Sequence, residues 1–255
     1  MRRRWILPIL LLASTLALTA CATAASPPSR LASYLPDAAV PAVAPMPQAS
    51  MRAGLLLIPD TGAPQAAPPA PEEALNRLAA QLQERITGGL PMIRIDTIIP
   101  FEGSGTPTAE TIQELGRRHG VEYVLLAIVS STEQEYPMTL FLGWTTHAQP
   151  GWRRDNWSLI EVALVDVGSG RTVLHAEGRG WATLDWPSAP GINQWYPVIY
   201  LRPNDPVRRI WPPTYEGAPN TLRVVALNEA AKRLVLNLQD AYYEKRQADR
   251  AASAN

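Results

Sequence analysis

Apolar residues recur along the chain with two periods, one typical of strands and one typical of amphipathic helices. Residues 53–58 are continuously apolar and of strand length, which predicts a strand buried on both faces. Residues 72–87 show helical spacing, and the predicted apolar stripe of that helix is Leu75, Leu78, Leu82 and Ile86. Residues 92–99 alternate as a second strand.

A second helix and three more strands are predicted further along the chain. Pro107 opens the helix, Gly120 ends it, and residues 121–130 form the third strand. The other two strands flank the connection Gly168-Ser169-Gly170, whose length and glycines favour a β-hairpin, and they cover residues 157–167 and 171–184.

The second arm of this hairpin has one face of small residues only. Because these side chains are so short, we expect a helix to approach the strand closely there; they are Ala176, Gly178, Gly180 and Ala182. The last predicted helix, residues 221–246, has an apolar stripe that includes Leu227, Leu234 and Leu238.

The elements follow the order βαβαβββα, which predicts an α/β (α+β) fold with a mixed sheet and helices packed on it. Residues 51–247 are enough for a single domain with a core of its own. A long insertion rich in Trp and Pro, residues 185–220, precedes the last helix, and residues 248–255 are predicted to be a disordered tail.

Tryptophan is concentrated in one part of the chain, since seven of the eight lie between Trp144 and Trp211. Trp157 and Trp181 are interpreted as core residues or a cross-strand pair of the hairpin. The insertion at residues 185–220 shows no helix or strand period and is too long for a mere connector.

Three interpretations of the insertion remain open. It folds back as a cap with a small aromatic core, it stacks sugar rings or presses on peptidoglycan or polysaccharide, or it contacts a membrane or another subunit. We predict that it carries the specific function, because its prolines restrict the loop and its arginines donate to carboxylates, phosphates or lipid headgroups. The predicted contact residues are Trp186, Trp195, Tyr196, Trp211, Arg202, Arg208 and Arg209.

The first 20 residues have the layout of an export signal, with three arginines followed by an apolar run that is short for a membrane span. Thr19 and Ala20 alone would suit an ordinary signal peptide. However, Leu18-Thr19-Ala20-Cys21 resembles the lipobox of bacterial lipoproteins. That resemblance implies cleavage before Cys21, the only cysteine, and attachment of a diacylglycerol and of an acyl chain such as palmitate.

The residues around the lipobox extend this expectation. Ala22, where an aspartate would retain a lipoprotein at the inner membrane, implies the outer membrane, with the protein on its periplasmic face in a two-membrane bacterium. Residues 21–50, rich in Ala and Pro, are predicted to be a tether that could reach ~90 Å at ~3.1 Å per residue.

Composition and candidate chemistry point away from catalysis and from nucleic acid. Without its first 20 residues the chain has 20 Lys+Arg, three fewer than the full 23, against 23 Asp+Glu. No histidine pair among His119, His147 and His175 has metal-ligand spacing. The aspartates are interpreted as solvated turn residues rather than paired carboxylates, namely Asp155, Asp166, Asp185 and Asp205. We therefore expect no enzyme activity, cofactor or metal.

Three segments of the domain resemble a group of envelope lipoprotein domains that includes the curli secretion lipoprotein, the Pel polysaccharide lipoprotein and the amino-terminal domain of TolB. They are residues 116–127 (GRRHGVEYVLLA), 162–174 (VALVDVGSGRTVL) and 226–234 (ALNEAAKRL). Residues 29–36 (SRLASYLP) are similar to the rhombotarget lipoproteins.

These resemblances imply a non-enzymatic outer-membrane lipoprotein that acts in envelope assembly or secretion through protein contacts, with itself in a ring or with other envelope proteins. The alternative is a monomeric periplasmic domain that binds a glycan or a partner protein.

Overall fold

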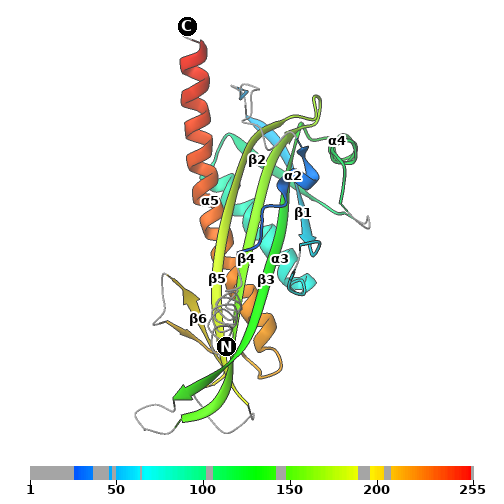
Figure 1. The fold of residues 1–255 in the computed structure, drawn as a ribbon. Helices are drawn as coiled ribbons and strands as arrows, with labels where there is room; N and C mark the ends of the chain where they lie inside the picture. Colours follow the sequence, from blue (N-terminus) through cyan, green and yellow to red (C-terminus); the bar gives the residue numbers. More distant parts are fainter. Residues whose placement is uncertain are drawn as a thin grey trace, which may run out of the picture.

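The structure of the protein is a computed structural model, and it describes residues 26–36, 46–47, 50–63, 65–101, 106–141, 148–188, 196–203 and 208–253. Seven strands form one curled mixed sheet in the order β2-β1-β3-β4-β5-β6-β7 (Figure 1).

The parallel part of the sheet is formed by the first three strands. β1 (Met51–Asp60) lies between β2 (Ile93–Ile99) and β3 (Tyr123–Phe141) and pairs in parallel with both. The connections are helical, as parallel neighbours require: α3 (Glu72–Gly89) links β1 to β2, and α4 (Ala109–Arg118) links β2 to β3.

The rest of the sheet is antiparallel. β4 (Ala148–Asp166) pairs with β3 over its whole length, and β5 (Thr172–Pro187) pairs with β4. Gly170 in their connection has φ +72°, a conformation that glycine adopts without strain. Two short strands follow β5 toward this edge of the sheet, β6 (Val198–Arg202) and β7 (Arg209–Ile210).

Each face of the sheet is covered by different helices. The face that we call the α5 face contributes Leu55, Leu125 and Val162 to a core shared with α3 and with α5 (Ala218–Ser253). The opposite face, which we call the α2 face, contributes Leu56, Leu126 and Ala163 to a second core. Adjacent residues of β1 and β3 thus enter different cores, which confirms the prediction that β1 is buried on both faces.

α5 lies directly on the small residues of β5. A Cβ added to Gly178 would stand 2.2 Å from Ala230 O, and one added to Gly180 would stand 2.0 Å from Ala226 O. The predicted close approach of a helix to this strand is confirmed. A half-buried ion pair between Arg223 and Glu133, with Nε to Oε1 at 2.7 Å, ties the start of α5 to β3.

Part of the predicted tether belongs to the folded body. Residues 26–36 run along the α2 face and include the single-turn helix α2 (Leu31–Tyr34). Leu31 and Tyr34 of this helix, and Leu35 after it, are buried in the second core. Arg30 Nε donates to Asp60 Oδ2 at 2.8 Å. A four-residue helix shows no period in the sequence, so the prediction of an unstructured segment there fails because packing, not local propensity, orders it.

The predicted element order βαβαβββα is confirmed, and the corrections concern lengths and additions. β3 and β4 extend by about ten residues beyond the predicted apolar runs, to Phe141 and back to Ala148. The insertion at residues 185–220 is not wholly irregular, because it contains β6 and β7. α5 continues through residues 248–253 of the predicted disordered tail and rises past the top of the sheet (Figure 1).

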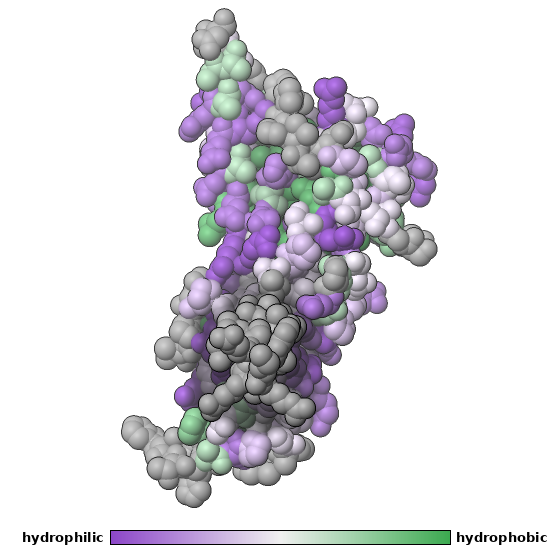
Figure 2. Space-filling view, viewed as in Figure 1, coloured by the Kyte–Doolittle hydropathy of each residue, from purple (hydrophilic) through white to green (hydrophobic). Residues whose placement is uncertain are grey.

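Hydrophilic side chains follow the visible side of α5 toward its C-terminal end (Figure 2). No helix in the described part of the chain is long and apolar enough to cross a membrane.

Candidate functional site

Two aspartates predicted to be solvated turn residues instead lie within strands and are buried. Asp185 on β5 is 3% exposed and accepts from Arg153 Nε at 2.6 Å and from Nη2 at 2.8 Å. Asp155 on β4 is 5% exposed and accepts from Tyr136 Oη at 2.9 Å and from Thr183 Oγ1 at 2.5 Å. These donors come from neighbouring strands, so the pairing depends on a strand register that the sequence does not reveal.

The electrostatics of this cluster favour a structural role. The bidentate bond to Asp185 raises the pKa of Arg153 above its ordinary value. Burial, and then the hydrogen bond to Asp155, raises the pKa of Tyr136, so its hydroxyl remains a donor at neutral pH. Each carboxylate has its own donors, and the cluster locks β3, β4 and β5 in register.

The other candidates for chemistry are dispersed. Asp166 is the last residue of β4 and accepts from Ser169 N at 2.6 Å in the turn that follows. His119 caps the C-terminus of α4 and His175 lies on β5, whereas His147 and Asp205 fall outside the described residues. Among the residues described, no group of three or more His, Cys, Asp or Glu side chains could hold a metal ion.

Below the buried core, the α2 face of the sheet carries aromatic and cationic side chains. Trp157 and Trp181 are cross-strand partners, and their rings stack with centroids 5.5 Å apart at 18°, which confirms the predicted pair. Arg202 lies opposite Trp181 with its guanidinium carbon 5.5 Å from the Tyr200 ring centroid, and Arg209 lies opposite Tyr200. We call these five residues the aromatic-arginine surface.

Trp186, one of the predicted contact residues, lies on the other face and is half-buried. Its ring stacks on Tyr215 with centroids 6.2 Å apart, and Arg154 lies 4.7 Å from its centroid. It also packs against a small core formed by Ala182, Leu184, Ile199, Ala218, Leu222 and Ala226. These contacts of Trp186 fit the interpretation of the insertion as a cap.

Two aromatic side chains on the same face as Trp186 have no such cover. Trp152 is 40% exposed and lies opposite both Pro137 and Trp186, and Phe141 at the end of β3 is 64% exposed. Alternation along β3 and β4 places both on the α5 face, at the end of the hairpin that extends past the first turn of α5 (Figure 1). We call Phe141, Trp152, Trp186 and Tyr215 the aromatic end.

The remaining predicted contact residues are divided between solvent and partial burial. Trp211 is 53% exposed just after β7, and Arg208 and Arg209 are exposed. Tyr196 is half-buried, and its hydroxyl donates to Phe141 O at 3.4 Å. Trp195 and the proposed lipid-bearing Cys21 lie outside the described residues.

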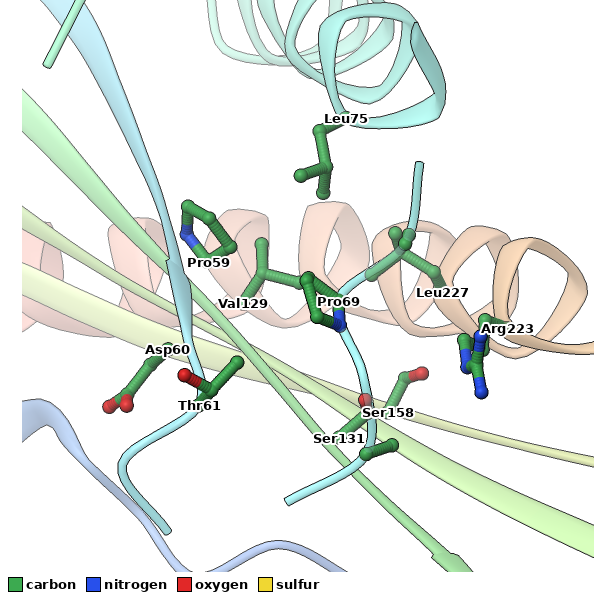
Figure 3. Close-up of a pocket in the computed structure, with 12 residues that line it drawn as sticks. Pro59, Asp60, Thr61, Pro69, Leu75, Val129, Ser131, Ser158, Arg223 and Leu227 are labelled. Carbon is green, nitrogen blue, oxygen red and sulfur yellow. The ribbon is translucent and has the colours of Figure 1, made fainter. Parts of the chain in front are cut away.

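Two hollows in the described part of the chain differ in size and openness. One cavity, beneath Leu75 of α3 and beside Arg223 and Leu227 of α5, has a volume of about 20 Å³, which is room for one water molecule (Figure 3). An open groove of about 460 Å³ lies at the free edge of β5. The carboxylate of Glu161 in that groove is already bonded to Ser29 Oγ and Arg30 N.

Comparison with solved structures finds chains of similar but distant architecture. A PelC dodecamer from Paraburkholderia phytofirmans has 15% identity over 77% of this chain and 91% of its own, with a TM-score of 0.31. A putative lipoprotein from Caulobacter crescentus has 14% identity over 75% and 91%, with a TM-score of 0.29.

A third structure is a putative neuraminyllactose-binding hemagglutinin homolog from Helicobacter pylori. It has 9% identity over 82% of this chain and 93% of its own, with a TM-score of 0.40. No protein-family model and no curated protein matches the chain.

Proposed function

We propose that the protein is a non-enzymatic lipoprotein, anchored through Cys21 to the periplasmic face of the outer membrane, which acts in envelope assembly or secretion through protein contacts. The observation that carries this proposal is the aromatic end. Its exposed members, Phe141 at 64% and Trp152 at 40%, stand on a part of the sheet that no described helix covers.

The aromatic end has the composition and the rigidity of a protein-binding surface. Large aromatic side chains are enriched where proteins meet and supply much of the binding energy. Trp152 is the cross-strand neighbour of Trp186, whose ring stacks on Tyr215, and Tyr215 Oη donates to Pro187 O at 2.9 Å. Because Trp186 and Tyr215 are already held in place by these contacts, binding at the aromatic end loses little conformational entropy.

The exposed aromatics are not required to close the core. Trp186, Ile210 and Val225 already cover the apolar cluster at this end of the sheet. Phe141 and Trp152 therefore form an additional apolar surface that is accessible to a partner, either another envelope protein or a neighbouring copy in a ring. Light scattering on the chain from residue 22 onward distinguishes a ring from a monomer. If the chain is monomeric, the partner of this surface is a different protein.

Site-specific photo-crosslinking in cells tests the proposal. A photoreactive phenylalanine analogue in place of Phe141 or Trp152 should give discrete crosslinked species. Leu236 and Tyr243 on α5 are matched control positions, because they are similarly exposed at 60% and 57% but lie away from the aromatic end. Crosslinks from the α5 positions alone would reject the aromatic end as the contact surface.

A further inference from the structure

The folded body begins only a few residues after the proposed anchor. Arg179 Nη1 donates to Ser26 Oγ at 2.5 Å and to Pro27 O at 3.2 Å. Arg30 N then donates to Glu161 Oε2 at 2.7 Å, and Ser29 Oγ donates to the same carboxylate. From Ser26 onward this segment is held on the α2 face.

The length of the linker between Cys21 and Ser26 therefore limits the distance between the membrane and the sheet. Five residue steps separate Cys21 from Ser26, and a fully extended chain advances at most about 3.5 Å per step, or about 17 Å in all. The ~90 Å reach expected of a 30-residue tether does not apply. The α2 face near Arg179 must lie within this shorter distance of the bilayer that holds the lipid.

The aromatic-arginine surface begins next to Arg179, the residue that binds the end of this linker. Trp181 is two residues from Arg179 on the same face of β5, or about 7 Å along the strand. The row containing Tyr200 is about 7 Å further. Both rows therefore lie within about 14 Å of Arg179 along the strand, close to the point where the linker meets the sheet.

The charges of this surface match an anionic bilayer. Arg153 and Arg179 are paired with Asp185 and Glu177. Arg202 and Arg209 have no ion-pair partner among the described residues, and they flank the Tyr200 ring on the same face. Tryptophan and tyrosine prefer the bilayer interface, and an arginine near an anionic leaflet is attracted by its negative surface potential.

We propose that the aromatic-arginine surface lies against the headgroups of the leaflet that holds Cys21, so that the α2 face is directed toward the membrane and the α5 face away from it. This inference rests on the lipid anchor of the proposed function. It assigns the two aromatic surfaces different partners: anionic phospholipid for the aromatic-arginine surface and protein for the aromatic end.

Vesicle cosedimentation tests the surface without the anchor. A Cys21→Ser chain that lacks residues 1–20 retains every described residue, and it should sediment with vesicles of phosphatidylethanolamine and phosphatidylglycerol but not of phosphatidylcholine. The double variant Arg202→Glu/Arg209→Glu should lower the bound fraction at least about tenfold. The corresponding double lysine variant should retain binding.

Two control variants distinguish loss of membrane binding from loss of folding and from a nonspecific effect of net charge. Arg209→Glu alone changes an exposed side chain and should weaken binding with an unchanged melting midpoint. Arg85→Glu changes an exposed arginine of α3 on the α5 face and should leave binding unchanged. An equal loss from Arg85→Glu, or no vesicle binding by the parent chain, overturns the proposal; binding to purified peptidoglycan instead would reassign the surface to a glycan.

Fatty-acid labelling in cells reports on the anchor separately. Label in the full chain that disappears in Cys21→Ser supports the anchor, and an unlabelled full chain overturns the proposed function at that point. If the full chain is labelled but the soluble Cys21→Ser chain does not bind anionic vesicles, the proposal of a membrane-facing surface is rejected and the anchor is retained.

Discussion

Gly178 and Gly180 illustrate how a single missing side chain determines where a helix can lie. Even a methyl group at either position would overlap backbone atoms of α5, at 2.2 Å and 2.0 Å from carbonyl oxygens. Backbone cannot move aside as a flexible side chain would. The small face of β5 therefore sets the distance between α5 and the sheet.

Gly178→Leu or Gly180→Leu should destabilise the protein by at least about 1–3 kcal/mol, because α5 has to shift away from the sheet. Gly88→Ala is a matched control, since nothing lies within 4 Å of its added Cβ, and it should raise the stability of α3 by about 0.5–1 kcal/mol. Melting midpoints measure both effects. Equal midpoints for the control and the two leucine variants would show that the α5 contact is absent.

The ion pair between Arg30 and Asp60 makes the packing of residues 26–36 dependent on pH. Burial alone would raise the pKa of Asp60, but the hydrogen bonds from Arg30 Nε and Gly62 N, together with the positive charge of Arg30, lower it below its ordinary value. A carboxylate with a lowered pKa contributes stability above its unfolded pKa of about 4 and loses it as pH falls through the folded value.

Asp60→Asn should therefore cost about 1–3 kcal/mol at neutral pH and reduce the loss of stability between about pH 5 and pH 3. Chemical denaturation across this pH range provides the measurement. A variant that keeps the parent's full acid sensitivity would exclude Asp60 as its source.

At the scale of elements, the sequence predicted those whose apolar period is sustained and missed those ordered by contact. The helix predicted at residues 72–87 is observed at Glu72–Gly89, and the predicted order of elements along the chain is observed with β6 and β7 added. The outer halves of β3 and β4 were missed because polar residues occupy both of their faces, as in the run STEQEY. Their cross-strand bonds, such as Tyr136 to Asp155, depend on a register that only the folded sheet defines.

The site was predicted only in part for the same reason. Tryptophan content drew attention to residues 185–220, yet Trp152 and Phe141, which lie outside that segment, are the exposed members of the aromatic end. Trp186 was predicted to contact a partner but packs against Tyr215 and the small core. Amino-acid type indicates that aromatics matter, whereas exposure depends on strand length and on which face carries α5.

The segment that contains α2 should behave as part of the domain. Leu35 is 2% exposed in the core of the α2 face, so Leu35→Ala should lower the stability by about 2–5 kcal/mol. Leu236→Ala, at a position 60% exposed on α5, should change it by less than about 0.5 kcal/mol. Matching midpoints for the two variants would instead support an unstructured tether throughout residues 21–50.

At the scale of the whole molecule, one sheet carries two surfaces of different chemistry on opposite faces. Residues 26–36 lie on the α2 face, which also carries Arg202, Arg209 and the stacked tryptophans. The aromatic end belongs to the α5 face and to the projecting hairpin. In the proposed arrangement, a lipid anchor at Cys21 would hold the proposed protein-binding surface away from the bilayer.

The most direct test of this account is the double variant Phe141→Ala/Trp152→Ala, with Trp186→Ala for comparison. Melting midpoints of the purified proteins would be compared with the size of the complexes that each forms in cells, measured by native electrophoresis. The account predicts a loss of stability below about 1 kcal/mol for the double variant but loss of its complexes, against about 3–5 kcal/mol for Trp186→Ala. A double variant that is severely destabilised, with complexes surviving in proportion to its folded fraction, would contradict the account.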